Sequence, residues 1–239
     1  MELDFEFMEK AFPFLLKAIP LTLFLAGLVL LLSFVPAFLM AEKRIEGHGF
    51  LERGVALYVS FIRGTPLVLQ ILLVYALLPS VLNYIVKLCG SSFDVFHGVN
   101  PLWYAVVVFT LNTTAMMSEI FRSAILSVSS GQMEAGLTIG LTKFQTNVEI
   151  ILPQALSSAI PNLCSLTVNL IKGTSLAFFM GVKDIMAAAK IQAAYGYNYI
   201  EAYLEVFLLY LIICTFIQVV YKLLEIHFGW YRRASQVLP

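Results

Sequence analysis

The chain has few charged residues for its length. Of its 239 residues, 13% are charged and 60% are hydrophobic. A soluble domain usually carries about 25% charged residues, because a surface that faces water has to be polar. We therefore expect much of the surface of this chain to face lipid rather than water.

Further absences argue against several functional classes. The formal net charge is zero, whereas nucleic-acid binding needs a basic excess, so no nucleic-acid partner is expected. The phosphate-cradling pattern G-x-x-x-x-G-K-[ST] does not occur, so we expect no ATPase site in this chain. Cysteines and histidines are scattered singly: Cys89, Cys164, Cys214, His48, His97 and His227. Their spacing predicts no disulfide framework, no metal site and no catalytic centre.

Long apolar segments occupy most of the chain. A transmembrane helix needs about 20 apolar residues, and five segments meet this length: 14–41, 55–78, 101 to about 119–127, 155–180 and 202–226. We predict an all-α fold, a polytopic helical membrane protein with about five transmembrane helices in a single domain, 1–239. Part of the 79–100 connector is expected to form an interfacial helix, and 184–196 a helical connector. The acidic N-terminus and long first apolar run argue against a cleavable signal peptide.

The distribution of basic residues predicts the orientation in the membrane. Five spans place the two termini on opposite sides. With the N-terminus outside, the cytoplasmic side receives eight Lys and Arg residues and the outer side at most five, which agrees with the positive-inside rule. The C-terminus and the polar 129–154 loop are then cytoplasmic. The segment Trp230 to Arg233, directly after the last span, is expected to form an aromatic belt and a basic stop, with Gly229 ending the helix.

The 129–154 loop carries the most specific pattern in the chain. Residues 131–140 read GQMEAGLTIG, and after nine more residues IILP follows at 150–153. The pattern predicts two short helices separated by a turn at Gly140, since glycine adopts backbone angles that other residues avoid. Small residues around Glu134 would let another protein approach that helix closely. Pro153 is expected to start the next membrane helix, where its missing amide is harmless.

This loop resembles the EAA motif of ABC importer permeases of type I, in which Glu-Ala-Ala, three residues, Gly, nine residues and Ile-x-Leu-Pro form the coupling helices. One departure is Gly136 in place of the second Ala, which keeps the position small and should loosen the helix by about 1 kcal/mol. The resemblance implies that the loop docks on a cytoplasmic ATPase through Glu134, Ala135, Gly136, Gly140, Ile150, Leu152 and Pro153. An isolated Glu134 and Gly140 would read as a solvated charge and an ordinary turn, but the match extends to residue 153.

Other segments resemble the polar amino-acid uptake family of these permeases. RGTPL at 63–67 with Gln70, SEIFR at 118–122 and KGTSL at 172–176 are similar to signatures of that family. Met116 stands where the family usually has Tyr, and Gly173 where Asp is common. The resemblance extends over 20–233 and is weakest around 89–98.

The resemblance implies a non-enzymatic permease subunit of an ATP-driven importer in a bacterial cell membrane. Its expected partners are two ATPase subunits that hold ATP and Mg, a second permease copy or a close paralogue, and an extracytoplasmic binding protein. The substrate is expected to be a polar amino acid. The missing acidic group at Gly173 favours a neutral or sulfur-containing one, such as L-cystine, over a cationic one.

Breaks in the membrane helices mark candidate substrate contacts. Residues 64–66 break the second segment and Gly173 can break the fourth, and irregular backbone inside a bilayer survives only where protein or a water-filled cavity covers it. Such breaks can bind small zwitterions. Candidates for lining a substrate path are Thr65, Asn169, Thr174 and Ser175. Alternatively, these side chains bond neighbouring carbonyls and serve helix packing.

The charged residues within the spans leave several roles open. Arg63 lies in the second segment, where an unpaired charge costs several kcal/mol. It can reach the interface, pair with Glu119, or line the path. Glu119 and Arg122 lie one helical turn apart and can pair with each other.

Two other functional classes make different demands on the sequence. An ion-coupled secondary carrier predicts inverted repeats and intramembrane carboxylates, but no repeat is visible and Glu119 is the one candidate carboxylate near a span. A membrane enzyme would need a cluster of His, Asp or Cys at the membrane face, which the sequence does not show.

Overall fold

The structure, a computed structural model, describes residues 3–47 and 49–236, with side chains described up to Gly229. Within these residues it is helical, with no strand. Candidate membrane spans by length and composition are α1 (Phe5–Glu46), α3 (Leu67–Leu88), α5 (Pro101–Leu126), Lys143–Met180, which contains α8 (Leu152–Gly173), and Tyr199–Gly229, which is part of α10 (Tyr199–Gln236). The predicted all-α membrane fold is confirmed.

Shorter helices connect or extend these long ones. They are α2 (Phe50–Gly64), α4 (Val95–Gly98), α6 (Ser130–Thr138), α7 (Lys143–Thr146), the π-helical η1 (Asn147–Ile151), the 3-10 helix η2 (Thr174–Met180) and α9 (Ile185–Gly196). The segment predicted as a helical connector, 184–196, is α9. Its N-cap is Asp184, whose Oδ1 accepts the Ala187 amide at 2.9 Å. Complete burial of Asp184 raises its pKa to about 6.

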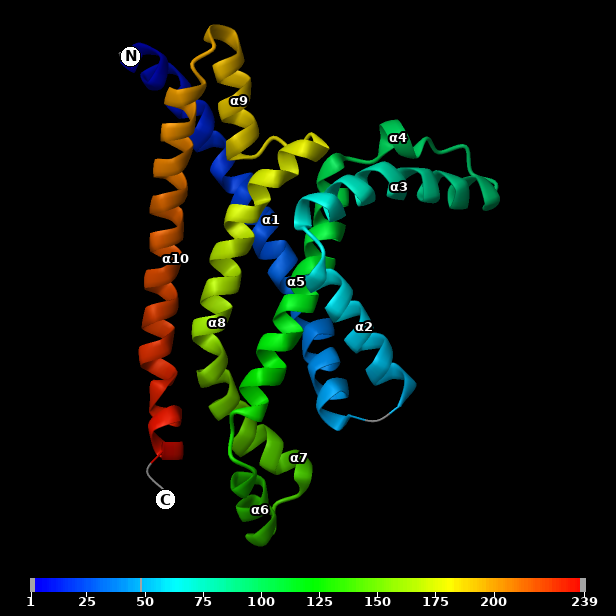
Figure 1. The fold of residues 1–239 in the computed structure, drawn as a ribbon, viewed down its shortest axis with the longest axis vertical. Helices are drawn as coiled ribbons and strands as arrows, with labels where there is room; N and C mark the ends of the chain where they lie inside the picture. Colours follow the sequence, from blue (N-terminus) through cyan, green and yellow to red (C-terminus); the bar gives the residue numbers. More distant parts are fainter. Residues whose placement is uncertain (1–2, 48, 237–239) are drawn as a thin grey trace.

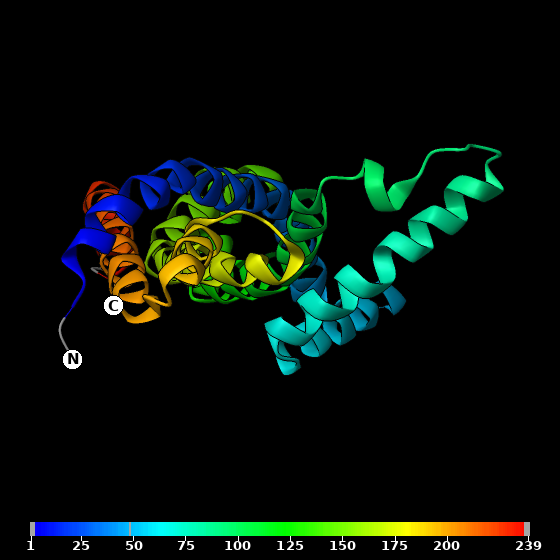
Figure 2. The same ribbon diagram turned by 90° about the horizontal axis from the view of Figure 1, so that it is seen from above.

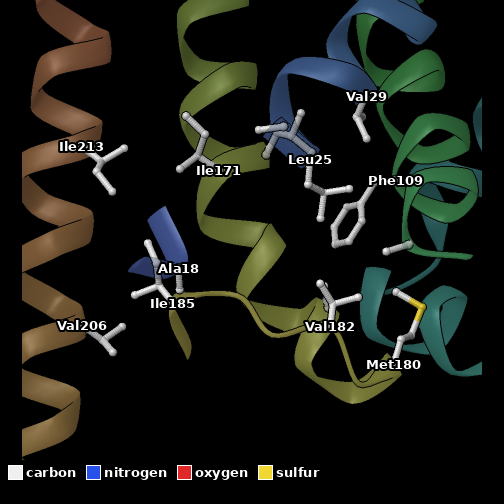
Figure 3. Packing of buried hydrophobic residues seen from close by; sticks show 14 of the residues in the cluster. Ala18, Leu25, Val29, Phe109, Ile171, Met180, Val182, Ile185, Val206 and Ile213 are labelled. Atoms are coloured by element: carbon white, nitrogen blue, oxygen red, sulfur yellow. The ribbon is translucent and has the colours of Figure 1, made fainter. Parts of the chain in front are cut away.

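Helices α1, α5, α8 and α10 form an elongated bundle (Figure 1), in which α1 packs most extensively against α5. The buried positions of α1 follow helical spacing of three and four residues: Ala11, Leu15, Ala18, Thr22, Leu25, Ala26, Val29, Ser33, Ala37 and Ala41. Small residues at such positions let helix backbones approach closely. Larger core side chains, among them Leu25, Phe109 and Met180, belong to one cluster of buried hydrophobic residues (Figure 3).

The two ends of the bundle carry different elements. The N-terminus lies with α9 at one end, and the C-terminus lies near the other end, where α6 and α7 project (Figure 1). The termini are therefore at opposite ends, and the 129–154 loop shares its end with the C-terminus. Which end faces the cytoplasm stays a prediction.

The predicted bounds of the second span were wrong. Helix α2 ends at Gly64, and α3 begins at Leu67 and continues to Leu88 with Pro79 inside it. Thr65 is extended, with φ −117° and ψ 142°, because the proline that follows disfavours the helical conformation. The break redirects the chain, and α3 runs across the long axis of the bundle and away from it (Figures 1 and 2).

Two further helix ends differ from their predicted positions. Gly229 does not end the last helix, since α10 continues to Gln236. The side chains of the predicted belt, Trp230 to Arg233, lie outside the described residues, as does His48. At Gly173 the chain changes from α-helix to 3-10 helix, but Gly173 itself keeps helical angles of φ −65° and ψ −27°. The change of helix type therefore does not use the conformational freedom of glycine.

Candidate functional site

A cavity of about 500 Å³ opens between α2, α5 and α8. Helix α8 contributes a polar face to it. Asn162, Ser165, Asn169 and Gly173 line the cavity and recur every three or four residues, which places them on one side of the helix. Polar side chains on one face of an apolar helix avoid lipid when that face meets a cavity or protein. The cavity therefore accounts for the polar residues of this span.

The break between α2 and α3 forms one edge of the cavity, and Gln70 holds it in place. The side-chain nitrogen of Gln70 donates to the Ile62 carbonyl at 2.9 Å and to the Thr65 hydroxyl at 2.8 Å. Asn112 of α5 donates to the Gln70 side-chain oxygen at 3.0 Å. The buried Gln70 thus pairs polar backbone atoms that the break leaves without helical partners.

Charged side chains cluster at the cavity around Glu119 of α5. Arg44 of α1 forms an ion pair and a hydrogen bond with Glu119 Oε2. Arg63 Nη1 lies 3.6 Å from the same oxygen, and Arg122 Nη1 lies 3.6 Å from Oε1. Both predicted pairings of Glu119, with Arg63 and with Arg122, are therefore present as loose contacts. Arg63 and Glu119 also line the cavity.

The four predicted path residues occupy two kinds of position. Thr65 and Asn169 lie in the cavity wall. Thr174 is fully buried and its hydroxyl donates to the Ile171 carbonyl at 2.7 Å, while the Ser175 hydroxyl donates to the Lys172 carbonyl at 2.7 Å. Neither lines this cavity, and both make the packing contacts of the alternative interpretation. Their role in the path stays a prediction.

The 129–154 loop forms a short helix, α6, and turns at Gly140 as the pattern predicted. The second predicted short helix and the start of a new helix at Pro153 were wrong, because the helix is continuous from Lys143 to Met180. Gly140 has φ +90° in the turn between α6 and α7, a left-handed angle that glycine adopts readily. Thr142 then starts α7 with a capping box completed by Gln145. Pro153 occupies the first turn of α8. Ile150, Leu152 and Pro153 are half-buried.

The surface of α6 is open where the resemblance placed partner contacts. Glu134 and Ala135 are exposed, whereas Gly136 is buried. Large apolar side chains surround them without cover: Leu137, Ile139, Phe144 and Val148 are all at least 40% exposed. These groups lie on the hairpin formed by α6, the turn at Gly140, α7 and η1, at the end of the bundle (Figure 1). Exposed apolar groups gathered in this way are typical of a protein-binding surface.

Gly136 allows α6 and α7 to touch. A Cβ atom on Gly136 would lie 2.5 Å from Cγ2 and 2.7 Å from Oγ1 of Thr146, which is itself fully buried. Gly136 stands where the motif has its second Ala, and the β-branched Thr146 of the facing helix occupies the space that an alanine side chain would need. Glycine lowers the helix propensity of α6, but it lets α6 and α7 pack more closely.

Sequence reasoning missed members of this site, among them Arg44 and Asn112. Arg44 was counted only among the eight basic residues of the predicted cytoplasmic side, and Asn112 was not singled out. Arg44 is 75 positions from Glu119, and Asn112 is 42 from Gln70. The polar character of Asn112 within an apolar segment was the one available signal, since such residues usually have a partner.

Comparison with protein families identifies the group to which this architecture belongs. A family model described as "Binding-protein-dependent transport system inner membrane component" matches residues 33–228. The chain belongs to this family. It is a multi-pass membrane protein and an amino-acid ABC transporter permease, and the ATPase of such a transporter is a separate subunit.

Individual relatives agree with this assignment. The chain is 35% identical over 223 residues to the probable amino-acid permease protein YxeN of Bacillus subtilis, covering 93% of this chain and 95% of that protein. It is 36% identical over 193 residues to the probable amino-acid ABC transporter permease protein PatM of Vibrio harveyi, covering 80% and 82%. An L-cystine transport system permease protein of B. subtilis, TcyB, is 36% identical, covering 83% and 79%.

A solved structure confirms the fold. The crystal structure of an amino acid ABC transporter with histidines superposes with a TM-score of 0.79, covering 95% of this chain and all of that chain. The sequence identity is 24%, so the likeness concerns the fold alone. The break between α2 and α3 and the projecting hairpin thus occur within an ABC importer permease fold.

Proposed function

We propose that this permease forms half of the translocation path of an importer for a neutral amino acid, with L-cystine as the leading candidate. The observation that carries this proposal is that α7 of the hairpin and α8 of the cavity wall belong to one continuous helical segment. The segment Lys143–Met180 runs without interruption from the hairpin helix α7 into α8, and α8 supplies the polar wall of the cavity. Force applied to α7 by an ATPase would therefore move the cavity wall directly.

The proposed substrate rests on the cavity and on relatives. Asn162, Asn169 and Thr65 offer neutral hydrogen-bonding groups, which suit an uncharged polar side chain. The related TcyB and TcyL are named L-cystine transport system permeases, and TcyL is 31% identical to this chain. The residue at position 173 is Gly, so the cavity lacks an acidic group there.

The proposed assembly contains two ATPase subunits, a second permease that is an identical copy or a close paralogue, and an extracytoplasmic binding protein. ATP and Mg would be held by the ATPase subunits, in accord with the missing phosphate loop in this chain. The hairpin and C-terminus would face the cytoplasm and the N-terminus the outside. Of the four predicted path residues, Thr65 and Asn169 are the proposed substrate contacts because they line the cavity, whereas Thr174 and Ser175 would support the path from outside it.

The decisive experiment reverses the charge on the hairpin. The complex with its ATPase and loaded binding protein is reconstituted in liposomes, and ATP-driven uptake of labelled L-cystine and L-glutamine is measured. We expect Glu134→Lys to lower uptake by at least about tenfold, because a reversed contact costs more than about 1.4 kcal/mol. Membrane insertion should be unchanged, since Glu134 is exposed and outside the spans.

A matched control uses another exposed carboxylate of the same loop. Glu149→Lys in η1 changes charge by the same amount, and uptake should stay within about twofold of wild type. Uptake that survives Glu134→Lys, or that proceeds without ATP, would contradict the proposed coupling. Failure of the wild-type complex to take up any amino acid would refute the substrate class.

A further inference from the structure

The cluster around Glu119 holds more positive than negative charge. Three guanidinium groups, from Arg44, Arg63 and Arg122, surround one carboxylate. The three guanidinium groups and the one carboxylate together carry a net charge of two positive units. An excess charge beside a cavity in a membrane protein is costly unless it meets water or a ligand of opposite sign.

The three arginines share Glu119 unequally. Arg44 makes the hydrogen-bonded ion pair, and its side chain is 16% exposed. Arg63 lies 3.6 Å from the carboxylate, forms no hydrogen bond to another described residue, and is 49% exposed. Glu119 is thus occupied mainly by Arg44, and the donors of Arg63 are open to the cavity.

The remaining lining of the cavity is neutral. Apart from Arg63 and Glu119, the lining side chains are amides, hydroxyls and apolar groups. A guanidinium group matches a carboxylate with two parallel hydrogen bonds, which is a strong and geometrically selective pairing. Arg63 is therefore the cavity group best suited to a ligand carboxylate.

We propose that Arg63 binds the substrate carboxylate in this cavity and selects amino acids whose side chains carry no positive charge. This inference rests on the proposed function and extends it from neutral to neutral and acidic amino acids. A lysine or arginine substrate would bring a second positive charge beside Arg63. Glu119 could not compensate it, because Arg44 already occupies its carboxylate.

The last turn of α2 places Arg63 for this role. Arg63 lies two residues before Thr65, and Gln70 fixes the end of α2 by binding the Ile62 carbonyl and the Thr65 hydroxyl. Asn112 holds Gln70 from α5. The guanidinium group therefore projects from a supported helix end at the edge of the cavity.

Direct binding tests this role without the selectivity of the binding protein. The purified complex of permease and ATPase in lipid nanodiscs is titrated with labelled L-cystine, L-glutamine, L-glutamate and L-lysine. We expect Arg63→Gln to raise the Kd of the best-bound amino acid by about tenfold to a hundredfold, the usual value of a hydrogen bond to a charged group. L-Lysine should bind more weakly than the neutral and acidic amino acids.

Arg122→Gln is the matched control. Arg122 lies the same 3.6 Å from Glu119, but it does not line the cavity, so its removal should change Kd by less than about twofold. The α-carboxamide of the best-bound amino acid provides a second readout. Wild type should prefer the carboxylate over the carboxamide, and Arg63→Gln should abolish that preference, which a purely structural role for Arg63 would not do.

Three results would overturn the inference. They are an unchanged Kd for Arg63→Gln, tightest binding of L-lysine or L-arginine, and no measurable binding of any amino acid to the wild-type complex. Uptake of a neutral amino acid, measured in parallel with the binding protein present, separates the two proposals. If uptake persists while any of these three results holds, the carboxylate site is wrong and the importer function stands.

Discussion

Gly136 has no side chain, and the packing of the hairpin depends on that absence. Gly136 is buried against Thr146, and a Cβ atom added to Gly136 would lie less than 3.0 Å from Cγ2 and Oγ1 of Thr146. Thr146 cannot move aside easily, because it is short, β-branched and buried, and its hydroxyl donates to the Thr142 carbonyl at 3.0 Å. The residue that departs from the motif is thus the one that sets the distance between α6 and α7.

Gly136→Ala should loosen the hairpin despite the better helix propensity of alanine. Overpacking costs about 1–3 kcal/mol, more than the roughly 1 kcal/mol gained in the helix. Hydrogen exchange of the Leu141 amide, which bonds the Gly136 carbonyl at 3.1 Å, should accelerate by about fivefold or more.

Gly131→Ala in the same helix is the control, since its Cβ would meet its nearest neighbour at an ordinary 3.6 Å. It should leave exchange unchanged or slow it. Adding Thr146→Ala to Gly136→Ala should restore protection, because both close atoms are removed. Equal exchange in Gly136→Ala and wild type would contradict the steric argument.

The α2–α3 break is the element on which the cavity edge depends. Pro66 supplies no amide and Thr65 is extended, so the end of α2 loses its regular hydrogen bonds. A side chain replaces them, since Gln70 reaches back eight residues to Ile62. The break is therefore a corner held by side-chain hydrogen bonds.

Gln70→Leu should destabilise this corner by about 1–3 kcal/mol, since it removes the bonds of the Gln70 side chain to the Ile62 carbonyl and the Thr65 hydroxyl and leaves the Asn112 amide without its acceptor. The apparent unfolding temperature of the detergent-purified protein should fall by several degrees. Gln192→Leu, a half-buried position in α9, serves as the control and should have little effect. Equal shifts in the two variants would show that the Gln70 bonds carry no stability.

Across the whole molecule, Glu119 links three helices through one carboxylate. Arg44 comes from α1, Arg63 from α2, and Glu119 and Arg122 from α5. The cluster lies beside the cavity, so the charges that hold the helices together also set the potential inside it. Any motion that opens the cavity between α2 and α5 would have to stretch the Arg63 contact.

Glu119→Gln should destabilise the whole bundle, because it leaves three arginines without their shared counter-ion. The expected loss is about 1–3 kcal/mol, below the value for a fully buried pair because the carboxylate is partly exposed. Thermal unfolding at low and high NaCl measures it, and added salt should reduce the difference from wild type. Glu149→Gln, on the exposed face of η1, should unfold as wild type does, and a similar loss there would contradict the assignment.

Patterns within short stretches were sufficient for much of this architecture. Apolar length predicted five candidate spans, and the loop pattern predicted a short helix and the turn at Gly140 that follows it. Thr65 and Pro66 predicted the break, although not the direction that α3 takes after it. These features depend on the conformational preferences of residues near one another in the chain, which a linear pattern records.

Contacts between distant segments required the folded chain. Nothing near Arg44 indicates Glu119, and nothing near Gly136 identifies Thr146 as the residue that needs its space. Such pairs depend on the angle and rotation at which helices pack, which arise from many small contacts at once. Composition and spacing were therefore enough for a helical membrane protein with a two-helix turn at Gly140, and the permease family followed from motif resemblance, while packing alone brought three arginines to one carboxylate at the edge of a cavity.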